Sequence, residues 1–365
     1  MSSFSVDVNE ANGRQGLLEI EEKEIVTPSY IPTKTEFNYL QKSPHVEKRD
    51  YNKIKAGELV VWLDNEQIFR LINEDDYYTE TKYRMRAALK EMDTPVKLLH
   101  YNFYTDVNGL DAISLNLLLE LQEDVGVDVI EVPNLYIDWD YSRAMEKAIA
   151  WKKEKKIEKS LLGVACKIND IDLLLSKKDS MIGVGVNLNR FKKPLLYNIR
   201  EKLKNQEIWV HAYSAPREYN AVDRQGTLGI LINFFGVDSV STRVLNWKAM
   251  RGYMASLPDK TETDFIDMAN GTRYFSPTDY STHTFGFLES QFGEKKKLSE
   301  FCNCPVCQKY TIAEILSDHM STYAHTRSHQ AISYHREAEI YQDKLKNNES
   351  TEYLATKKFA KRITE

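Results

Sequence analysis

The chain of 365 residues has no long apolar segment. No apolar run approaches the ~20 residues that a membrane-spanning helix needs. The opening MSSFSVDVNE lacks the basic-then-apolar layout of a secretory signal peptide. We therefore expect a cytoplasmic, intracellular protein with no membrane partner. Its 42% hydrophobic and 28% charged residues are typical of a globular protein that buries a large core.

Cysteine is scarce, with four residues in the whole chain. A disulfide framework is excluded, because three cysteines lie close together at 302–307 while Cys166 stands alone. Basic residues are not in excess either, since 49 Lys and Arg against 54 Asp and Glu give a formal net charge of −5. This sign excludes an overall basic coat, so a nucleic acid would have to bind a local basic surface.

From about residue 57 to 245 the sequence alternates short apolar runs with amphipathic runs. Such alternation is typical of repeated βα units around a parallel sheet. It predicts seven strands, at Leu59–Leu63, Val96–His100, Val127–Val132, Leu161–Cys166, Ile182–Val186, Ile208–His211 and Val237–Ser241. Helices are expected at Asp140–Glu158 and Pro194–Leu203, and an eighth strand near Met268–Phe275. The pattern predicts an α/β fold of the (β/α)8 TIM-barrel type. A doubly wound open sheet is the alternative.

The strongest chemical pattern is Cys302-Asn-Cys-Pro-Val-Cys307. Thiolates two and three residues apart converge on one ion when a turn, helped here by Pro305, folds them together. Cys302, Cys304 and Cys307 leave one tetrahedral position open, and neutral imidazole is the usual partner of thiolates on zinc. The downstream candidates are His319, His325, His329 and His335. We expect a structural Zn²⁺ site that stabilises a late loop-and-helix unit, because metal-binding free energy becomes folding free energy.

Cys-x-Cys-x-x-Cys followed downstream by His resembles the zinc pattern of the tRNA-guanine transglycosylase superfamily. Residues 13–33, GRQGLLEIEEKEIVTPSYIPT, resemble the opening of that family: an Arg-x-Gly-Leu start, a short hairpin, and a Thr-Pro step into a strand. The resemblance selects His329 as the fourth ligand, with His325 as the runner-up. It implies an N-terminal hairpin and strand region capping the barrel at 1–56 and a barrel core at 57–290. A zinc-binding subdomain at 291–340 and a basic C-terminal helix at 341–365 follow.

The family exchanges bases by double displacement. An aspartate at the carboxyl end of a barrel strand attacks ribose C1′ and expels guanine, and a 7-deazaguanine base then captures the covalent intermediate. A carboxylate suits this step, because it is ionised at neutral pH and stabilises oxocarbenium character before bonding. The first family aspartate corresponds to Asp64 in VVWLDNEQIF, where Asn65–Gln67 replace the family's Ser-Gly-Gly. The alternative role of Asp64 is a helix N-cap.

The family's nucleophile segment resembles Gly236-Val-Asp-Ser-Val-Ser-Thr-Arg243. Aligned literally, the family's second aspartate falls on Ser241. We therefore predict Asp238, the nearest carboxylate, as the nucleophile. The alternative is a structural aspartate in a protein without base-exchange activity.

The resemblance also implies a guanine pocket. Asn134 takes the place of the family's base-reading aspartate, and Cys166 and Lys167 lie in the segment that replaces its Val-Gln-Gly-Gly loop. An amide offers a donor as well as an acceptor, whereas a carboxylate accepts both hydrogen bonds from guanine N1 and N2. Asp138 or Asp140 would then have to supply the missing charge.

Three further residues resemble parts of the family's site. Gly183 and Gly185 resemble its glycine-containing base platform, and His211 resembles the histidine that opens a strand-to-loop turn. A histidine that is hydrogen-bonded within the core is the alternative reading of His211.

The altered pocket motifs, and the lack of residues for an appended RNA-binding domain, resemble a divergent branch of the superfamily. That branch inserts 7-deazaguanine derivatives into DNA and occurs in phages and genomic modification clusters. We therefore expect a base-exchange transglycosylase acting on DNA with a preQ0-type base. The alternatives are the same reaction on tRNA and a catalytically silent subunit that dimerises with, or positions, an active partner. Lys295–Lys297 and the terminal helix are the candidate phosphate contacts.

Overall fold

The computed structural model describes residues 2–10, 13–135, 139–188, 200–215, 233, 236–244, 261–358 and 360. They form two compact units. The first holds the described residues of 1–34, 54–215 and 232–242, and the second holds those of 35–53 and 243–365. Asp138, residues 194–199 of the predicted helix and residues 361–365 of the basic end lie outside the described residues. Within the described part, no helix is both long and apolar enough to cross a membrane.

Six parallel strands form the main sheet of the first unit, in the order β4-β11-β10-β9-β8-β7. Their bounds are β4 Ser29–Tyr30, β7 Val129–Val132, β8 Ser160–Ala165, β9 Gly183–Asn187, β10 Trp209–Ala215 and β11 Ser239–Thr242. Nearly every residue in these strands is buried, as expected for a parallel sheet whose faces are both covered. The predicted α/β fold is confirmed at this level.

Two more parallel strands, β5 (Ala56–Leu63) and β6 (Val96–Phe103), pair with each other. β6 contacts the β7 edge of the six-stranded sheet, and β5 contacts its β4 edge. The backbone N–H of Asp128, just before β7, donates to Lys97 O on β6 at 2.9 Å. Thr33, just after β4, forms a parallel bridge with Glu58 on β5. All seven predicted strands are therefore present, as β5–β11, with ends that differ by a few residues.

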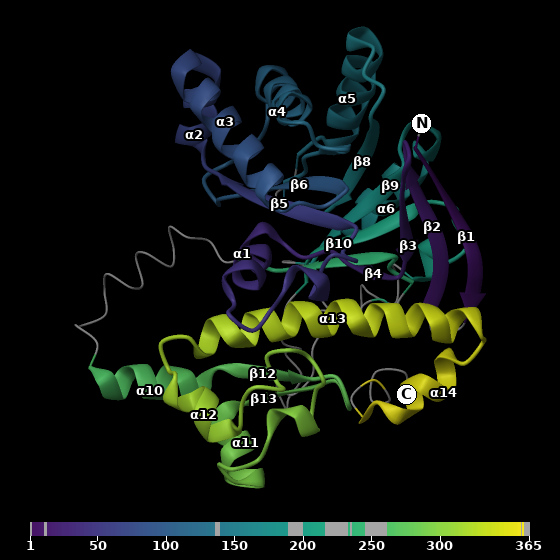
Figure 1. Cartoon of the computed structure of the whole chain (residues 1–365). Coiled ribbons are helices and arrows are strands. Elements are labelled where there is room, and N and C mark those ends of the chain that lie inside the picture. The colour runs from purple at the N-terminus through teal and green to yellow at the C-terminus, as the bar shows by residue number, and fades with distance from the viewer. Residues whose placement is uncertain are drawn as a thin grey trace. The chain divides into compact units, whose positions relative to one another are not determined.

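Helices follow most of these strands (Figure 1). They are α2 Asn65–Asn73, α3 Asp75–Glu91, α4 Ala112–Val125, α5 Tyr141–Lys155 and α6 Ile168–Leu175, with a 3-10 turn η2 at Lys178–Ser180. Asp64, Asp111 and Asp140 begin α2, α4 and α5, because each carboxylate accepts a hydrogen bond from the backbone N–H three residues later. The helix predicted at Asp140–Glu158 is confirmed as α5.

An antiparallel sheet of β1 (Ser2–Glu10), β2 (Gly13–Ile20) and β3 (Lys23–Thr27) completes the first unit. Its apolar side chains, including Leu18 and Ile25, share one core cluster with the first residues of β5, β6, β7 and β10. The sheet therefore packs against the amino-terminal ends of the parallel strands.

The prediction of an eighth parallel strand at Met268–Phe275 is wrong. Its first half belongs to α10 (Glu262–Gly271), which Thr261 starts with a capping box. After Thr272 the segment enters β12 (Arg273–Ser276), which pairs antiparallel with β13 (Ser281–Thr284). The strand beside β11 is instead β4, which has two residues and is therefore too short to show a periodic pattern.

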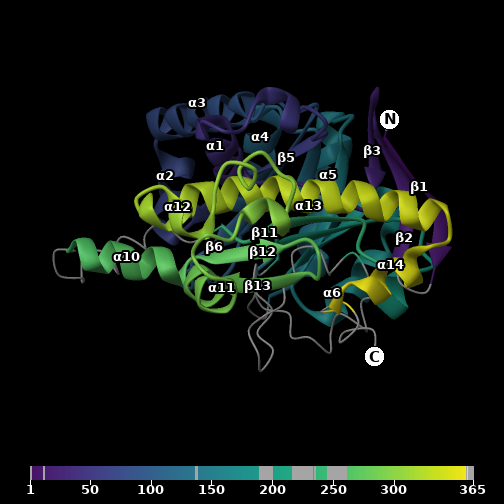
Figure 2. The ribbon, with the colours of Figure 1, turned by 60° about the horizontal axis from the view of Figure 1, so that its bottom comes forward.

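The second unit is mainly helical. Its elements besides α10, β12 and β13 are α1 Lys34–Lys42, η1 Lys48–Asp50, α11 Phe285–Phe292, η4 Leu298–Glu300, α12 Ile312–Ser317, α13 Thr322–Lys346 and α14 Ser350–Thr356. The long helix α13 packs against β12 and α14 (Figure 2). Residues 328–334 of α13 are buried on all sides, so this helix is the centre of the unit's core.

Candidate metal centre and strand-end site

Four metal-ligating side chains meet inside the second unit. Cys302, Cys304 and Cys307 lie in the loop between η4 and α12, and His329 lies on α13. Two backbone N–H groups of this loop donate hydrogen bonds to its own sulfur atoms. The N–H of Cys304 donates to Cys302 Sγ and the N–H of Cys307 donates to Cys304 Sγ, both at 3.4 Å. All four residues are buried, and their ligand atoms lie within 4.8 Å of one another.

The spacing of this cluster fits a tetrahedral metal ion. His329 Nδ1 lies 3.3 Å from the sulfur atoms of both Cys304 and Cys307. Zinc bonds of about 2.3 Å to sulfur and 2.1 Å to nitrogen would separate such a pair by roughly 3.5 Å. The four side chains form a closed Cys3His set that can hold a metal such as zinc, as the sequence predicts.

Charge in the cluster also favours a cation. Burial opposes protonation of His329, but Cys304 and Cys302 outweigh it and raise the pKa of His329 to about 10. Hydrogen bonds from Cys304 and Cys307 lower the pKa of Cys302. A divalent ion held by these ligands would compensate the charge of the thiolates.

Neighbouring groups orient His329 toward the sulfur atoms. Its Nε2 donates to the carbonyl oxygen of Phe275 on β12 at 2.7 Å, which leaves Nδ1 as the ligand atom. Tyr274 stacks on the imidazole with ring centroids 4.4 Å apart, and its hydroxyl lies 3.4 Å from Cys307 Sγ. Two consecutive residues of β12 therefore orient this ligand on α13.

His325, the runner-up ligand, lies one helical turn before His329 and outside the cluster. Its Nε2 is 3.1 Å from both the Tyr310 hydroxyl and the Asp318 carboxylate. The Tyr310 hydroxyl is also 2.7 Å from His45 Nε2. His325 therefore belongs to a separate hydrogen-bonded group.

The two predicted catalytic aspartates lie at opposite ends of the parallel strands. Asp64 follows β5 at its carboxyl end, whereas Asp238 precedes β11 at its amino end. β5 and β11 run in the same direction, because both are parallel to the segment Ser29–Thr33 that lies between them. One substrate atom at the carboxyl ends of the strands therefore cannot reach both carboxylates.

Asp238 is fully buried in an ion pair with Arg14 of β2. The guanidinium donates to Oδ1 at 2.8 Å and to Oδ2 at 2.5 Å, and the backbone N–H of Val210 donates to Oδ2 at 2.6 Å. Burial raises the pKa of Asp238, although Arg14 acts in the opposite direction. The carboxylate of Asp238 thus joins β2 to β11 at the amino end of that strand, and the prediction of Asp238 as a nucleophile gains no support from these contacts.

Asp64 has a structural partner as well. Its carboxylate accepts from the backbone N–H of Gln67 at 2.8 Å, and the Gln67 side chain accepts from the N–H of Asp64 at 3.0 Å. This reciprocal capping box starts α2 and corresponds to the N-cap alternative. Asp64 is nevertheless at the end of the sheet where α/β enzymes place their reacting groups.

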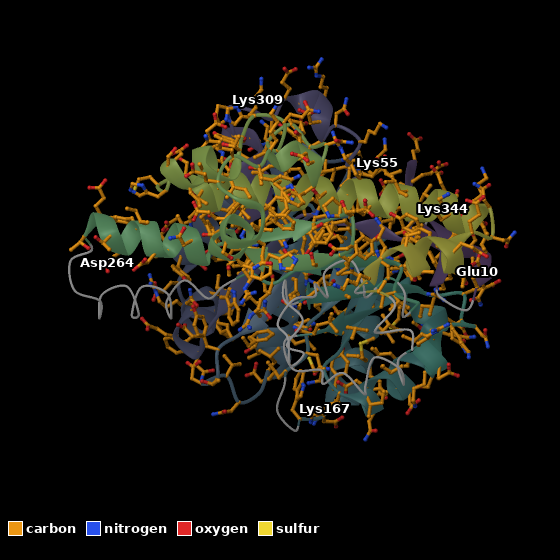
Figure 3. All side chains as sticks on the ribbon, turned by 90° about the horizontal axis from the view of Figure 1, so that it is seen from below. Glu10, Lys55, Lys167, Asp264, Lys309 and Lys344 are labelled. Carbon is orange, nitrogen blue, oxygen red and sulfur yellow. The ribbon has the colours of Figure 1, made fainter. Side chains whose placement is uncertain are left out.

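The residues predicted to read a base are used in local hydrogen bonds. The Asn134 amide donates to Val164 O at 2.7 Å and to Asp170 at 2.9 Å. Asp170 also accepts from the backbone N–H groups of Cys166 and Lys167, which starts α6. Cys166 is buried, and the side chain of Lys167 lies at the periphery of the first unit (Figure 3). Asp140 caps α5.

Gly183 and Gly185 make room for aromatic side chains inside the sheet. A Cβ on Gly185 would lie 2.4 Å from the Tyr213 ring, and one on Gly183 would lie 2.6 Å from Trp209 O. His211 bonds Glu58 at 3.0 Å and Ser239 at 2.8 Å, so it is a hydrogen-bonded core residue. The two glycines therefore have a packing role in the described structure.

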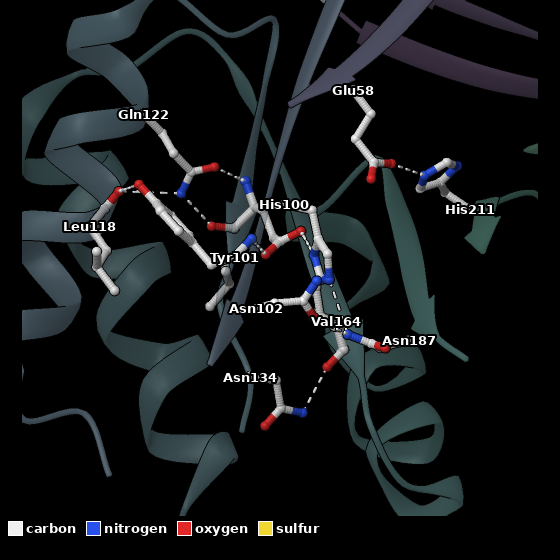
Figure 4. Close-up of polar contacts among 12 residues, drawn as sticks. Glu58, His100, Tyr101, Asn102, Leu118, Gln122, Asn134, Val164, Asn187 and His211 are labelled. Carbon is white, nitrogen blue, oxygen red and sulfur yellow. Dashed lines mark hydrogen bonds and ion pairs between the residues drawn. The ribbon is translucent and has the colours of Figure 1, made fainter. Parts of the chain in front are cut away.

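Sequence reasoning missed a buried polar network toward the carboxyl ends of the strands (Figure 4). His100 on β6 bonds Glu131 on β7 at 2.7 Å, and its other ring nitrogen is 3.0 Å from the Asn187 amide on β9. The ring of Tyr213 stacks on the imidazole of His100, with ring centroids 4.0 Å apart. Burial opposes protonation of His100, but Glu131 outweighs it and raises the pKa of His100. The sequence signal that could have revealed this network is a polar residue, such as Glu131, between apolar residues of a predicted strand.

The chain matches no protein-family model, and it is similar in sequence to no curated protein. The resemblance to the tRNA-guanine transglycosylases therefore rests on the motifs alone.

Proposed function

We propose that the eight parallel strands β4–β11 close into a (β/α)8 barrel. The parallel bridge between Thr33 and Glu58 supports closure at one edge, and the hydrogen bond from Asp128 N to Lys97 O supports it at the other. Such a barrel would place His100, Glu131 and Tyr213 in its interior. Its order differs from the expected one, because β4 takes the place of the strand expected near residue 270.

We infer that the Cys3His cluster binds one structural Zn²⁺. The donor set supports this assignment, because thiolates and imidazole are preferred zinc ligands and four protein ligands leave no position for a reacting water. The metal would hold the Cys302–Cys307 loop against α13 and β12.

We propose that the chain is a non-catalytic subunit of the transglycosylase type, which binds nucleic acid together with an active partner subunit. The observation that supports it is the position of the carboxylates. Ser241 stands where the family has its nucleophile, and Asp238 is held by Arg14 at the other end of the strand. A serine hydroxyl cannot form the glycosyl ester that an aspartate forms. The motif resemblance makes DNA the first substrate class to test and tRNA the second.

Base exchange by the chain itself is the second candidate. The position of Asp64 at the carboxyl end of β5 favours it, because this is the one predicted catalytic carboxylate at that end. The substrates would be guanine in DNA and a 7-deazaguanine base, and Asp64 would have to leave its cap to reach the sugar.

The deciding experiment is covalent trapping. The purified chain is incubated with guanine-containing DNA or tRNA at limiting 7-deazaguanine base, and adducts are resolved on denaturing gels. We expect binding without an adduct for the wild type, for Asp64→Asn and for Asp238→Asn. An adduct formed by the wild type and lost in Asp64→Asn would instead establish the second candidate.

The cellular role is tested by nucleoside mass spectrometry of DNA and tRNA from cells with and without the chain. If the chain is a subunit of an active enzyme, cells that lack it should lose a 7-deazaguanine nucleoside, although the isolated chain forms no adduct. Unchanged nucleosides in both nucleic acids would contradict the proposal.

A further inference from the structure

A basic groove lies at the amino-terminal ends of β8 and β9, in the first unit. Its volume is about 530 Å³. Side chains from the last turns of α5, the start of β8 and the η2 turn line it, together with Ser2 of β1. Three of the lining residues are Lys152, Lys153 and Lys156, and one is acidic, Asp179.

The groove lysines differ from their neighbours in having no carboxylate partner among the described residues. Nearby, Lys155 pairs with Glu120 at 3.3 Å, Lys159 with Glu123 at 2.8 Å and Lys177 with Glu146 at 3.2 Å. No such ion pair involves Lys152, Lys153 or Lys156 in the described part of the chain. Burial lowers the pKa of Lys152, as expected for an ammonium group that loses water without gaining an anion.

The end of α5 does not need these lysines to satisfy its carbonyl groups. The carbonyl oxygens of Lys152 and Lys153 accept hydrogen bonds from the backbone N–H groups of Lys156 and Ile157. This arrangement closes the helix through its own backbone. The ammonium groups therefore remain available to a ligand.

We propose that this groove is a binding site for a phosphate group. Three ammonium groups against one carboxylate leave a net positive lining, and the hydroxyls of Ser160 and Ser180 add hydrogen-bond donors. The six residues of β8 span roughly 20 Å, so the groove lies about that far from the carboxyl end of this strand. The site is therefore separate from the polar network around His100 and independent of the proposed function. The phosphate belongs either to a nucleic-acid backbone or to a free phosphorylated compound.

Two titrations of the full chain distinguish these sources. The first measures pyrophosphate binding by calorimetry, and the second measures binding of a fluorescent single-stranded DNA oligonucleotide by anisotropy over a range of salt concentrations. The test variant is Lys152→Gln with Lys153→Gln. The matched control is Lys155→Gln with Lys159→Gln, which removes the same charge from the same region outside the groove.

We expect the groove variant to weaken binding at least tenfold and the control to weaken it less than twofold. For the oligonucleotide, the salt slope should fall by about 1.4, since each lysine that contacts a phosphate of single-stranded DNA contributes about 0.7 to the slope. A loss confined to pyrophosphate identifies a phosphorylated compound, and a loss that includes the oligonucleotide identifies a nucleic-acid backbone.

Asp179→Asn provides a test in the opposite direction. Removal of the one acidic lining residue should tighten binding by about threefold, because it removes like-charge repulsion from a partly exposed site. The site is disproved if the wild type binds neither probe, or if the groove and control variants lose affinity equally. Circular dichroism of each variant confirms that the fold is retained.

Discussion

At the scale of single residues, the buried ion pair of Arg14 and Asp238 joins two segments that lie far apart in the sequence. The Arg-x-Gly-Leu start supplies the guanidinium, and the Gly-Val-Asp segment supplies the carboxylate. Asp238→Asn should lower the free energy of unfolding by about 3–5 kcal/mol, because it leaves a buried guanidinium without its counter-charge. Chemical denaturation measures the loss. The exposed pair Lys202–Asp172 gives the control, since Asp172→Asn should change stability by under about 0.5 kcal/mol.

Two glycines of the first unit make a matched pair for testing close packing. Gly185→Ala should destabilise the protein by about 1–3 kcal/mol, because the new methyl group would overlap the Tyr213 ring. Gly109→Ala meets no atom within 4 Å and should be nearly neutral. Thermal and denaturant unfolding of both variants provides the comparison. Equal effects would show that Tyr213 does not lie over Gly185.

The His100–Glu131 pair predicts a pH dependence. The folded-state pKa of His100 is raised, so its contribution to stability is complete below the unfolded pKa of about 6.5 and is lost as pH rises through the folded value. The stability difference between wild type and His100→Gln should therefore shrink with rising pH, by at most about 1.4 kcal/mol per pH unit. Denaturation series from pH 6 to 9 test this. A difference that grows with pH would contradict the sign.

At the scale of elements, the Cys3His cluster joins a loop to a helix that lies more than twenty residues later. We expect one zinc per chain by elemental analysis. Cys304→Ser and His329→Asn should lose it, because each removes one of four ligands. Cys166→Ser and His325→Asn are matched controls of the same residue types outside the cluster and should keep it. Retention of zinc by His329→Asn together with loss in His325→Asn would show that His325, and not His329, is the fourth ligand.

At the scale of the whole molecule, the two compact units should respond differently to a chelator. Metal removal should expose backbone amides of β12, the Cys302–Cys307 loop and the middle of α13, because the cluster supplies part of that unit's folding free energy. The amides of β8–β10 should keep their protection, because those strands have an apolar core of their own. Hydrogen exchange with and without chelator measures both. Equal deprotection throughout would mean that the units unfold together.

The fold was predictable where hydrophobic runs are long enough to show a period. Seven strands and α5 follow from such runs, and the three cysteines of the Cys3His cluster follow from residue type and spacing. The eighth strand was misplaced, because β4 has two residues and its identity depends on pairing with β11. His329 was preferred over His325 by family resemblance, since both lie on one helix. The structure separates them by the contacts of Phe275 and Tyr310.

The amino-acid sequence alone determined the α/β alternation and the three cysteines of the Cys3His cluster, because both depend on local periodicity and residue type. Only tertiary structure decided that His329 is the fourth member of the cluster and that Arg14 pairs with Asp238, because both depend on contacts between residues far apart in the sequence. Asp64 and Asp238 both lie next to a strand in the sequence, but one follows its strand and the other precedes it. Because β5 and β11 run in the same direction, Asp64 lies in a helix cap at one end of the strands and Asp238 lies in a buried ion pair at the other.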